Sequence, residues 1–163
     1  MVIYLKKIAI FSLILFIIDQ IVKLIVSFNV ELNSSICVIK NFFYISHVHN
    51  FGAAFSIFYG GRIFLILISI IALVCLYNFL LKNKEFRNLE IVSYSMLIGG
   101  ILGNLFDRIF YGYVIDYLDF YIFNYNYPVF NIADMCIVIS VCLLIIDMFR
   151  GGKNESNSWW GWF

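Results

Sequence analysis

The chain has 163 residues, of which 63% are hydrophobic and only 13% are charged, and its net charge is +1. The charged fraction is about half that of a typical soluble domain, which excludes a water-soluble globular protein, because so much apolar surface could not be kept from water. One proline and ten glycines leave no room for a flexible linker. We therefore expect a single integral membrane domain over residues 1–163, without a nucleic-acid partner.

Four stretches are apolar and long enough to cross a bilayer, which takes roughly 20 residues. Polar residues interrupt the first stretch, whereas the second is nearly continuous. The sequence therefore predicts an all-α membrane protein, a bundle of four transmembrane helices. The predicted spans are Ile8–Ser27, Ile63–Leu81, about residues 91–108, and Val129–Phe149.

Basic residues cluster before the first span, between the second and third, and after the fourth. With four spans, all three clusters lie on one side of the membrane, and the positive-inside rule makes that side cytoplasmic. Both termini are then cytoplasmic, and the segments Phe28–Arg62 and Ile109–Pro128 face the other compartment. The clusters are Lys6 and Lys7; Lys82, Lys84 and Arg87; Arg150 and Lys153.

The long segment after the first span has the composition of a small β-sheet. Ile36–Ile39 and Phe42–Ile45 are rich in β-branched and aromatic residues, and Lys40-Asn41 between them suits a hairpin turn. Continued through Val48 to Phe58, this pattern predicts a small extracytoplasmic β-element lying on the membrane. A short helix or loop is expected before the fourth span.

Four aspartates lie within or beside the predicted spans: Asp19, Asp107, Asp116 and Asp134. An ionisable group at bilayer depth costs roughly 2.5–3.5 kcal/mol, so it persists where function or a partner compensates. The predicted topology brings most of these acids to one depth, at the outer membrane face, with Asp19 just past the middle of its span. Asn50, Arg108 and Asn131 fall at the same depth, which is what a shared site requires.

Spacing groups the polar residues of the first and third spans. Asn104, Asp107 and Arg108 are three and four residues apart and share one face of a helix. Asp19 and Lys23 are four apart and can pair within the first span, which lowers the cost of both. For Asp107 two interpretations stay open, a structural ion-pair network at the end of the helix or a direct chemical role.

Asp116 and Asp134 form the candidate carboxylate pair. Asp116 is expected in a loop that re-enters or skirts the membrane, while Asp134 begins the fourth span and could act simply as a helix cap. Two close carboxylates share a proton, so that one serves as base and the other as acid. Such a pair can activate a water against a peptide carbonyl and protonate the leaving amine. Asp119, three residues on from Asp116, is expected to be a solvated or interfacial acid.

The remaining polar and thiol groups favour structural roles. His47 and His49 are expected on the surface of a strand, Asp147 beside Arg150 in a structural pair, and the four cysteines as small hydrophobic residues without disulfides or metal. Asn50 offers both a donor and an acceptor next to Gly52, where the backbone can approach closely. No metal site is expected.

Five motifs follow one another along the chain. They are Asp19-Gln20 with Lys23, Asn50-x-Gly52-Ala53-Ala54-Phe55, Gly99-Gly100 with Gly103-Asn104-x-x-Asp107-Arg108, Val114-x-Asp116, and Phe130-Asn131-x-Ala133-Asp134. With these motifs in order, the chain closely resembles lipoprotein signal peptidase, also called signal peptidase II, a bacterial aspartyl protease of the inner membrane. Tyr117, where phenylalanine is usual, and Phe51 depart from the family pattern, and the aromatic tail from Ser158 to Phe163 lies outside it.

The resemblance implies that Asp116 and Asp134 are catalytic, and that cleavage occurs before the lipidated cysteine of diacylglyceryl-modified prolipoproteins. It implies contacts with membrane lipid, and neither a cofactor nor an obligate protein partner. The supporting or substrate-binding residues would be Asn50, Gly52, Asn104, Asp107, Arg108, Asn131, Asp19 and Lys23. A small ion-coupled transporter is the rival interpretation, but the chain lacks the inverted repeats and broken helices typical of such proteins.

Overall fold

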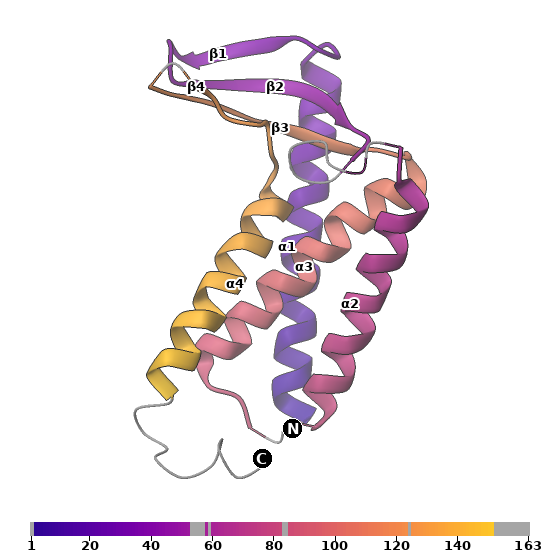
Figure 1. Cartoon of the computed structure of the whole chain (residues 1–163), viewed down its shortest axis with the longest axis vertical. Helices are drawn as coiled ribbons and strands as arrows, with labels where there is room; N and C mark the ends of the chain where they lie inside the picture. Colours follow the sequence, from indigo (N-terminus) through magenta and orange to yellow (C-terminus); the bar gives the residue numbers. More distant parts are fainter. Residues whose placement is uncertain (1, 53–57, 59, 83–84, 124, 152–163) are drawn as a thin grey trace.

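The computed structural model describes residues 2–52, 58, 60–82, 85–123 and 125–151. Four helices in these residues are long and apolar enough to span a membrane, with a small sheet at one end of the bundle (Figure 1). The prediction of a four-helix membrane bundle with a β-element is thus confirmed. The helices are α1 (Val2–Asn29), α2 (Arg62–Lys82), α3 (Asn88–Phe110) and α4 (Ile132–Gly151).

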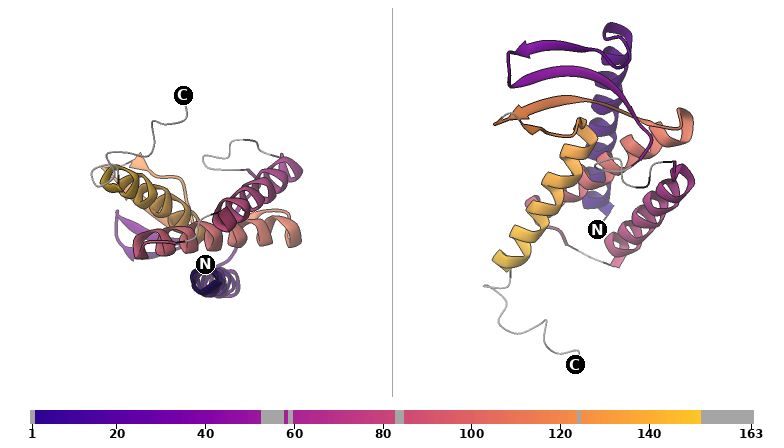
Figure 2. Two further views of the ribbon diagram at one scale, coloured as in Figure 1. Left: turned by 90° about the horizontal axis from the view of Figure 1, so that it is seen from below. Right: turned by 45° about the horizontal axis from the view of Figure 1, so that its top comes forward.

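The helix α3 is the centre of the bundle and packs against each of the other three helices. Viewed along the bundle, α1 lies on one side of α3, while α2 and α4 splay apart on the other (Figure 2). Glycines allow the close approach. A Cβ at Gly99 would lie 2.9 Å from the carbonyl oxygen of Ser12, and one at Gly100 would lie 2.5 Å from that of Ala133. Either distance is too short for a real side chain, so α3 can contact α1 and α4 so closely only through glycine.

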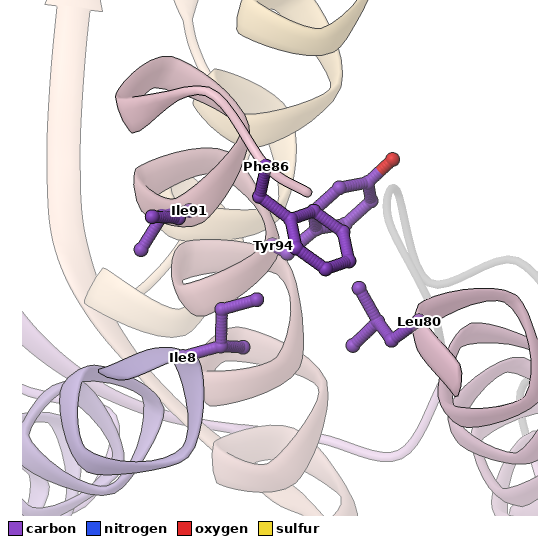
Figure 3. Packing of buried hydrophobic residues seen from close by; sticks show 5 residues of the cluster. All are labelled: Ile8, Leu80, Phe86, Ile91 and Tyr94. Atoms are coloured by element: carbon purple, nitrogen blue, oxygen red, sulfur yellow. The ribbon is translucent and has the colours of Figure 1, made fainter. Parts of the chain in front are cut away.

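An apolar cluster ties three helices together at the end of the bundle farther from the sheet. Ile8 of α1, Leu80 of α2 and Tyr94 of α3 meet around Phe86 and Ile91 (Figure 3). This packing fixes the half of the bundle farther from the sheet, whereas Asn104, Asp107 and Arg108 of α3 lie in the half nearer to it.

The cluster is closed by a polar clamp. The guanidinium of Arg87, just before α3, binds the carboxylates of Glu90 and Asp147. Asp147 is therefore structural, as predicted, although its described partner is Arg87; the side chain of Arg150 lies outside the described part of the chain.

The sheet has four antiparallel strands in the order β1-β2-β3-β4, with bounds Ser35–Ile39, Phe43–Asn50, Val114–Ile122 and Tyr125–Asn126. The hairpin predicted at Lys40-Asn41 joins β1 to β2, and Asn41 has a φ of 61°, which asparagine tolerates well. Strands β2 and β3 come from distant parts of the sequence. Their pairing places Asn50 opposite Val114 and Val48 opposite Asp116.

The structure differs from the predicted elements in three places. Asp116 lies in the regular strand β3, not in a loop, because β2 pairs with residues 114–120. The fourth helix starts at Ile132 rather than Val129, because Phe130 is still held by the sheet: its N–H donates to the carbonyl oxygen of Leu118 at 3.1 Å. In addition, α1 starts six residues before the predicted Ile8.

Some predictions fall on residues outside the described ranges. These are the continuation of the sheet through Ala53, Ala54 and Phe55, the basic residues Lys84 and Lys153, and the aromatic tail from Ser158 to Phe163.

Candidate active site

The carboxylate of Asp116 is held between two amides from other elements. Asp116 lies on β3 and is only 2% exposed. Its Oδ2 accepts a hydrogen bond from Nδ2 of Asn50 (2.8 Å), and its Oδ1 accepts one from Nδ2 of Asn131 (2.7 Å). These bonds fix the orientation of the carboxyl group from both sides.

The second carboxylate, Asp134, lies in the first turn of α4, next to Asn131. The two residues cap the helix reciprocally: the N–H of Asp134 donates to Oδ1 of Asn131 (2.9 Å), and the N–H of Asn131 donates to Oδ2 of Asp134 (3.2 Å). Nδ2 of Asn104 on α3 donates to the remaining oxygen, Oδ1 (2.7 Å). The cap predicted as the alternative for Asp134 is therefore present, and it also orients the carboxylate beside Asp116.

Asn131 is the residue that joins the two acids. It is fully buried, donates from its side chain to Asp116, and exchanges two hydrogen bonds with Asp134. The same Nδ2 lies 3.2 Å from Oδ1 of Asn104. Asn131 thus binds both carboxyl groups, that of Asp116 through its side-chain amide and that of Asp134 through its main-chain N–H.

The surroundings of Asp116 favour its protonated form. Burial, together with the nearby charge of Asp134, raises the pKa of Asp116 to about 7, although the hydrogen bonds from Asn50 and Asn131 act to lower it. A carboxyl group with this pKa holds its proton at neutral pH part of the time. Two carboxyl groups arranged in this way can hold one proton between them, as general acid–base chemistry at neutral pH requires.

A second polar cluster inside the bundle is centred on Lys23 of α1, which makes three polar contacts. Its Nζ lies 2.8 Å from Oδ2 of Asp19, 2.8 Å from Oδ2 of Asp107 and 3.1 Å from Oδ1 of Asn104. An ammonium group has three donors, so all of them are used. Lys23 and Asp19 are each 1% exposed, and Asp107 is 0% exposed. The predicted pairing of Asp19 with Lys23 is confirmed.

Asp107 takes part in this network from both of its oxygens. Nε2 of Gln20 donates to its Oδ1 (2.9 Å), and the N–H of Ile115, next to Asp116, donates to its Oδ2 (3.3 Å). Asp107 is absent from the lining of the cavity described below. Of the two interpretations left open, these contacts favour a network that joins α1, α3 and β3 beneath Asp116.

Asp19 extends the same network to α4. Its Oδ1 accepts from the N–H of Ala133 (3.0 Å), which lies next to Asp134. A Cβ added to Gly103 would lie only 2.6 Å from Oδ2 of Asp19. The glycine therefore makes room for the carboxylate between α1, α3 and α4.

Arg108, in the last turn of α3, lines the same cavity as the two acids. Its Nη2 donates to the carbonyl oxygen of Gly52 (3.0 Å), and its Nη1 lies 3.4 Å from that of Asn104. The N–H of Gly52 in turn donates to Oδ1 of Asn50 (2.9 Å). The chain after β2 is thus held against α3 directly above Asp116.

A cavity of about 570 Å³ opens beside these residues. Its polar side carries Asp116, Asp134, Asn50 and Arg108, and the remainder is apolar. The apolar part is formed by β3, the connection from β4 to α4, and one face of α4, with Phe120, Ile122, Val129, Phe130, Met135, Ile137, Val138 and Ile139 among its residues. Two carboxyl groups in the lining of a mostly apolar cavity can cut a bond in a substrate that is itself mostly apolar.

Two predictions for single residues were wrong. Asp119 is not solvated: it is 6% exposed, and its Oδ2 accepts a hydrogen bond from Oγ of Ser46 (2.7 Å). His47 is not on the surface either, since it is 6% exposed and its Nδ1 lies 2.9 Å from the carbonyl oxygen of Val30. Both are buried because β2 and β3 pair, which could not be inferred from either segment alone. Asp119 does not line the cavity, which separates it from the candidate pair.

Two further polar residues had no role predicted from the sequence. Gln20, which is part of the Asp19-Gln20 motif, bridges Asp107 to the carbonyl oxygen of Gly103 (3.3 Å). Arg62 binds the last carbonyls of α3, and no motif marked it.

No group of three or more His, Cys, Asp or Glu side chains within the described residues is placed to hold a metal ion. The four cysteines, all of which are described, are free.

Comparisons with known proteins find matches over most of the chain. The family described as Signal peptidase (SPase) II matches residues 11–150. A protein named lipoprotein signal peptidase from Alteromonas mediterranea is 43% identical over 150 residues, which cover 90% of this chain and 82% of the relative. A protein of the same name from Staphylococcus aureus is 37% identical over 139 residues, which cover 85% of each chain.

The fold also matches solved structures. One, described as a bacterial membrane enzyme structure by the in meso method at 2.3 Å resolution, superposes with a TM-score of 0.85 and 34% identity, with 94% of each chain covered. Another, described in the same words at 1.9 Å resolution, gives a TM-score of 0.79 and 36% identity, with 88% of this chain and 92% of that chain covered.

Proposed function

The chain belongs to the signal peptidase II family, and we propose that it is an aspartyl endopeptidase that removes signal peptides from diacylglyceryl-modified prolipoproteins by cutting before the lipidated cysteine. The observation that carries the proposal is the pair of carboxyl groups, Asp116 and Asp134, joined by Asn131 at the polar end of an apolar cavity.

In the proposed reaction the pair shares one proton. The raised pKa of Asp116, about 7, favours the proton on that residue and leaves Asp134 as the carboxylate. Asp134 takes a proton from a water molecule as the water oxygen bonds to the scissile carbonyl carbon. At the same time Asp116 gives its proton to the carbonyl oxygen. When the tetrahedral intermediate collapses, the carbon–nitrogen bond breaks and the proton on Asp134 passes to the leaving amine. Asp116 takes a proton back from one hydroxyl group of the intermediate, which forms the new carboxyl group and restores the starting pair. In this proposal the two aspartates carry out every proton transfer, so the reaction needs no cofactor.

The neighbouring residues have roles of orientation in this proposal. Asn131 and Asn50 hold the carboxyl of Asp116 toward the cavity, and Asn104 does the same for Asp134. Arg108 lines the cavity and would bind carbonyl or lipid oxygen atoms of the substrate. Lys23, Asp19 and Asp107 hold α1, α3 and α4 at the spacing that these contacts need.

The apolar part of the cavity would receive the acyl chains and part of the signal peptide. Burial of one CH₂ is worth about 0.8 kcal/mol, so partial burial of two acyl chains supplies several kcal/mol. The enzyme would lie in the bacterial cytoplasmic membrane with both termini in the cytoplasm and the site at the extracytoplasmic face, as the distribution of basic residues predicts.

A comparison of matched substrates tests this proposal. The purified enzyme is incubated with one prolipoprotein with and without its diacylglyceryl group, and products are identified by mass spectrometry. We expect cleavage directly before the cysteine and a much lower initial rate without the lipid. Equal rates would contradict selection by the lipid, and absence of cleavage in both would contradict the proposed activity.

A further inference from the structure

We propose that Arg62, the first residue of α2, is a positioning residue for Arg108, an inference that rests on the proposed function. The guanidinium of Arg62 binds the two main-chain oxygens at the end of α3. Its Nε donates to the carbonyl oxygen of Arg108 (2.7 Å), and its Nη2 donates to that of Ile109 (2.9 Å).

These contacts suit the end of a helix. The last carbonyl groups of a helix have no partner within it and carry partial negative charge, so a forked cation that binds two of them is favourable. A glycine in the turn after α3 leaves room for the guanidinium of Arg62. Gly112 has a φ of 88°, and a Cβ on it would lie 3.2 Å from Nη1 of Arg62. The N–H groups of Tyr111 and Gly112 both donate to the carbonyl oxygen of Asp107 (2.8 and 3.2 Å).

Arg108 is held from two directions as a result. Its carbonyl oxygen accepts from Arg62, at the start of α2, and its guanidinium donates to the carbonyl oxygen of Gly52, just after β2. The first contact fixes the main chain from which the Arg108 side chain departs, and the second fixes the end of that side chain. Without Arg62, the last turn of α3 would be free to fray, because the carbonyl oxygens of Arg108 and Ile109 would lose this partner. The main chain of Arg108 could then shift, and its guanidinium would no longer be held in one position.

The contact also gives α2 a connection to the site. No described residue of α2 lines the cavity, whereas Arg108 lines it together with both acids. Arg62 itself lies outside the cavity, so its effect on the reaction must pass through α3. We therefore assign Arg62 to substrate positioning rather than to the chemical step.

Steady-state kinetics of Arg62→Gln and Arg62→Lys on a lipidated prolipoprotein test the assignment. Because the proposed role of Arg108 is substrate binding, Arg62→Gln should raise KM about ten-fold and change kcat less than about two-fold, with solvent screening of this exposed side chain keeping the effect modest. Arg62→Lys should not restore KM, since lysine lacks the fork that reaches two carbonyls.

The matched control is Arg87→Gln, which removes an arginine that also joins helices, but at the other end of the bundle. It should lower the temperature of unfolding and leave kcat and KM of the folded enzyme unchanged. The assignment is overturned if folded Arg62→Gln keeps the wild-type KM, if lysine restores it fully, or if kcat falls at constant KM. Failure of the wild-type enzyme to cleave would instead contradict the proposed function.

Discussion

Asp116 is a buried carboxyl group whose pKa is raised, and this has a measurable effect on stability. Its pKa is about 7 in the folded protein, against an ordinary value of 3.8 for an aspartate. The folded state therefore binds the proton more tightly than the unfolded state, and stability falls as pH rises from about 4 to about 7, by on the order of 4 kcal/mol at most.

This pH dependence can be checked by thermal unfolding in detergent at about pH 5 and about pH 8. The wild-type protein should lose more stability over this interval than Asp116→Asn, which has no carboxyl group to titrate there. Parallel losses in the two proteins would show that Asp116 is not the group responsible.

Asp107 should contribute to folding as well as to activity. It is fully buried and faces Lys23, Gln20 and the N–H of Ile115. Removing one member of a buried ion-pair network leaves the other charge partly uncompensated, so Asp107→Asn should cost about 3–5 kcal/mol of unfolding free energy. Chemical unfolding and folded yield measure this cost. Normal stability with complete loss of turnover would instead place Asp107 among the catalytic residues.

Arg108 offers a second test at this scale. Arg108→Lys should lower the rate of cleavage markedly at near-normal stability. Lysine lacks the planar fork with which arginine can bind the carbonyl oxygen of Gly52 and still present a donor to a substrate in the cavity. Initial rates on a lipidated prolipoprotein decide this, and a wild-type rate would show that charge alone is sufficient.

At the scale of elements, the contact of α3 with α4 depends on Gly100. A Cβ there would lie 2.5 Å from the carbonyl oxygen of Ala133 and 2.8 Å from Cγ1 of Ile137. Gly100→Ala should push α4 away from α3, destabilise the protein by about 1–3 kcal/mol, and weaken the bond from Asn104 to Asp134. Unfolding and cleavage assays should both report a loss. Val92→Ala, on an exposed face of α3, is the control and should behave as wild type.

The helices were predictable because each is a long apolar stretch, and the polar residues of α3 were grouped correctly because spacing on one helix is a local property. The strand β3 was missed because its residues become a strand only by pairing with β2, more than sixty residues earlier. The same pairing buries Asp119 and His47. Arg62 was missed for a related reason: its partners are main-chain oxygens, which leave no trace in a sequence motif.

At the scale of the whole molecule, the orientation in the membrane remains a prediction. The basic residues near Lys6, Lys84 and Lys153 require both termini in the cytoplasm and the sheet outside. Reporter fusions after Lys84 and after Lys153 should read cytoplasmic, and a fusion after Asn33 should read external. An external signal after Lys153 would break the four-span topology.

The central claim is that Asp116 and Asp134 together cut the substrate, and single substitutions test it most directly. Purified Asp116→Asn and Asp134→Asn should be folded but cleave a lipidated prolipoprotein at no measurable rate, because an amide cannot exchange the proton that the reaction requires. Asp119→Asn, which alters a buried acid on the same strand but outside the cavity, should remain active. The account would be contradicted if Asp116→Asn or Asp134→Asn retained activity, or if folded Asp119→Asn were inactive while Asp116→Asn cleaved normally.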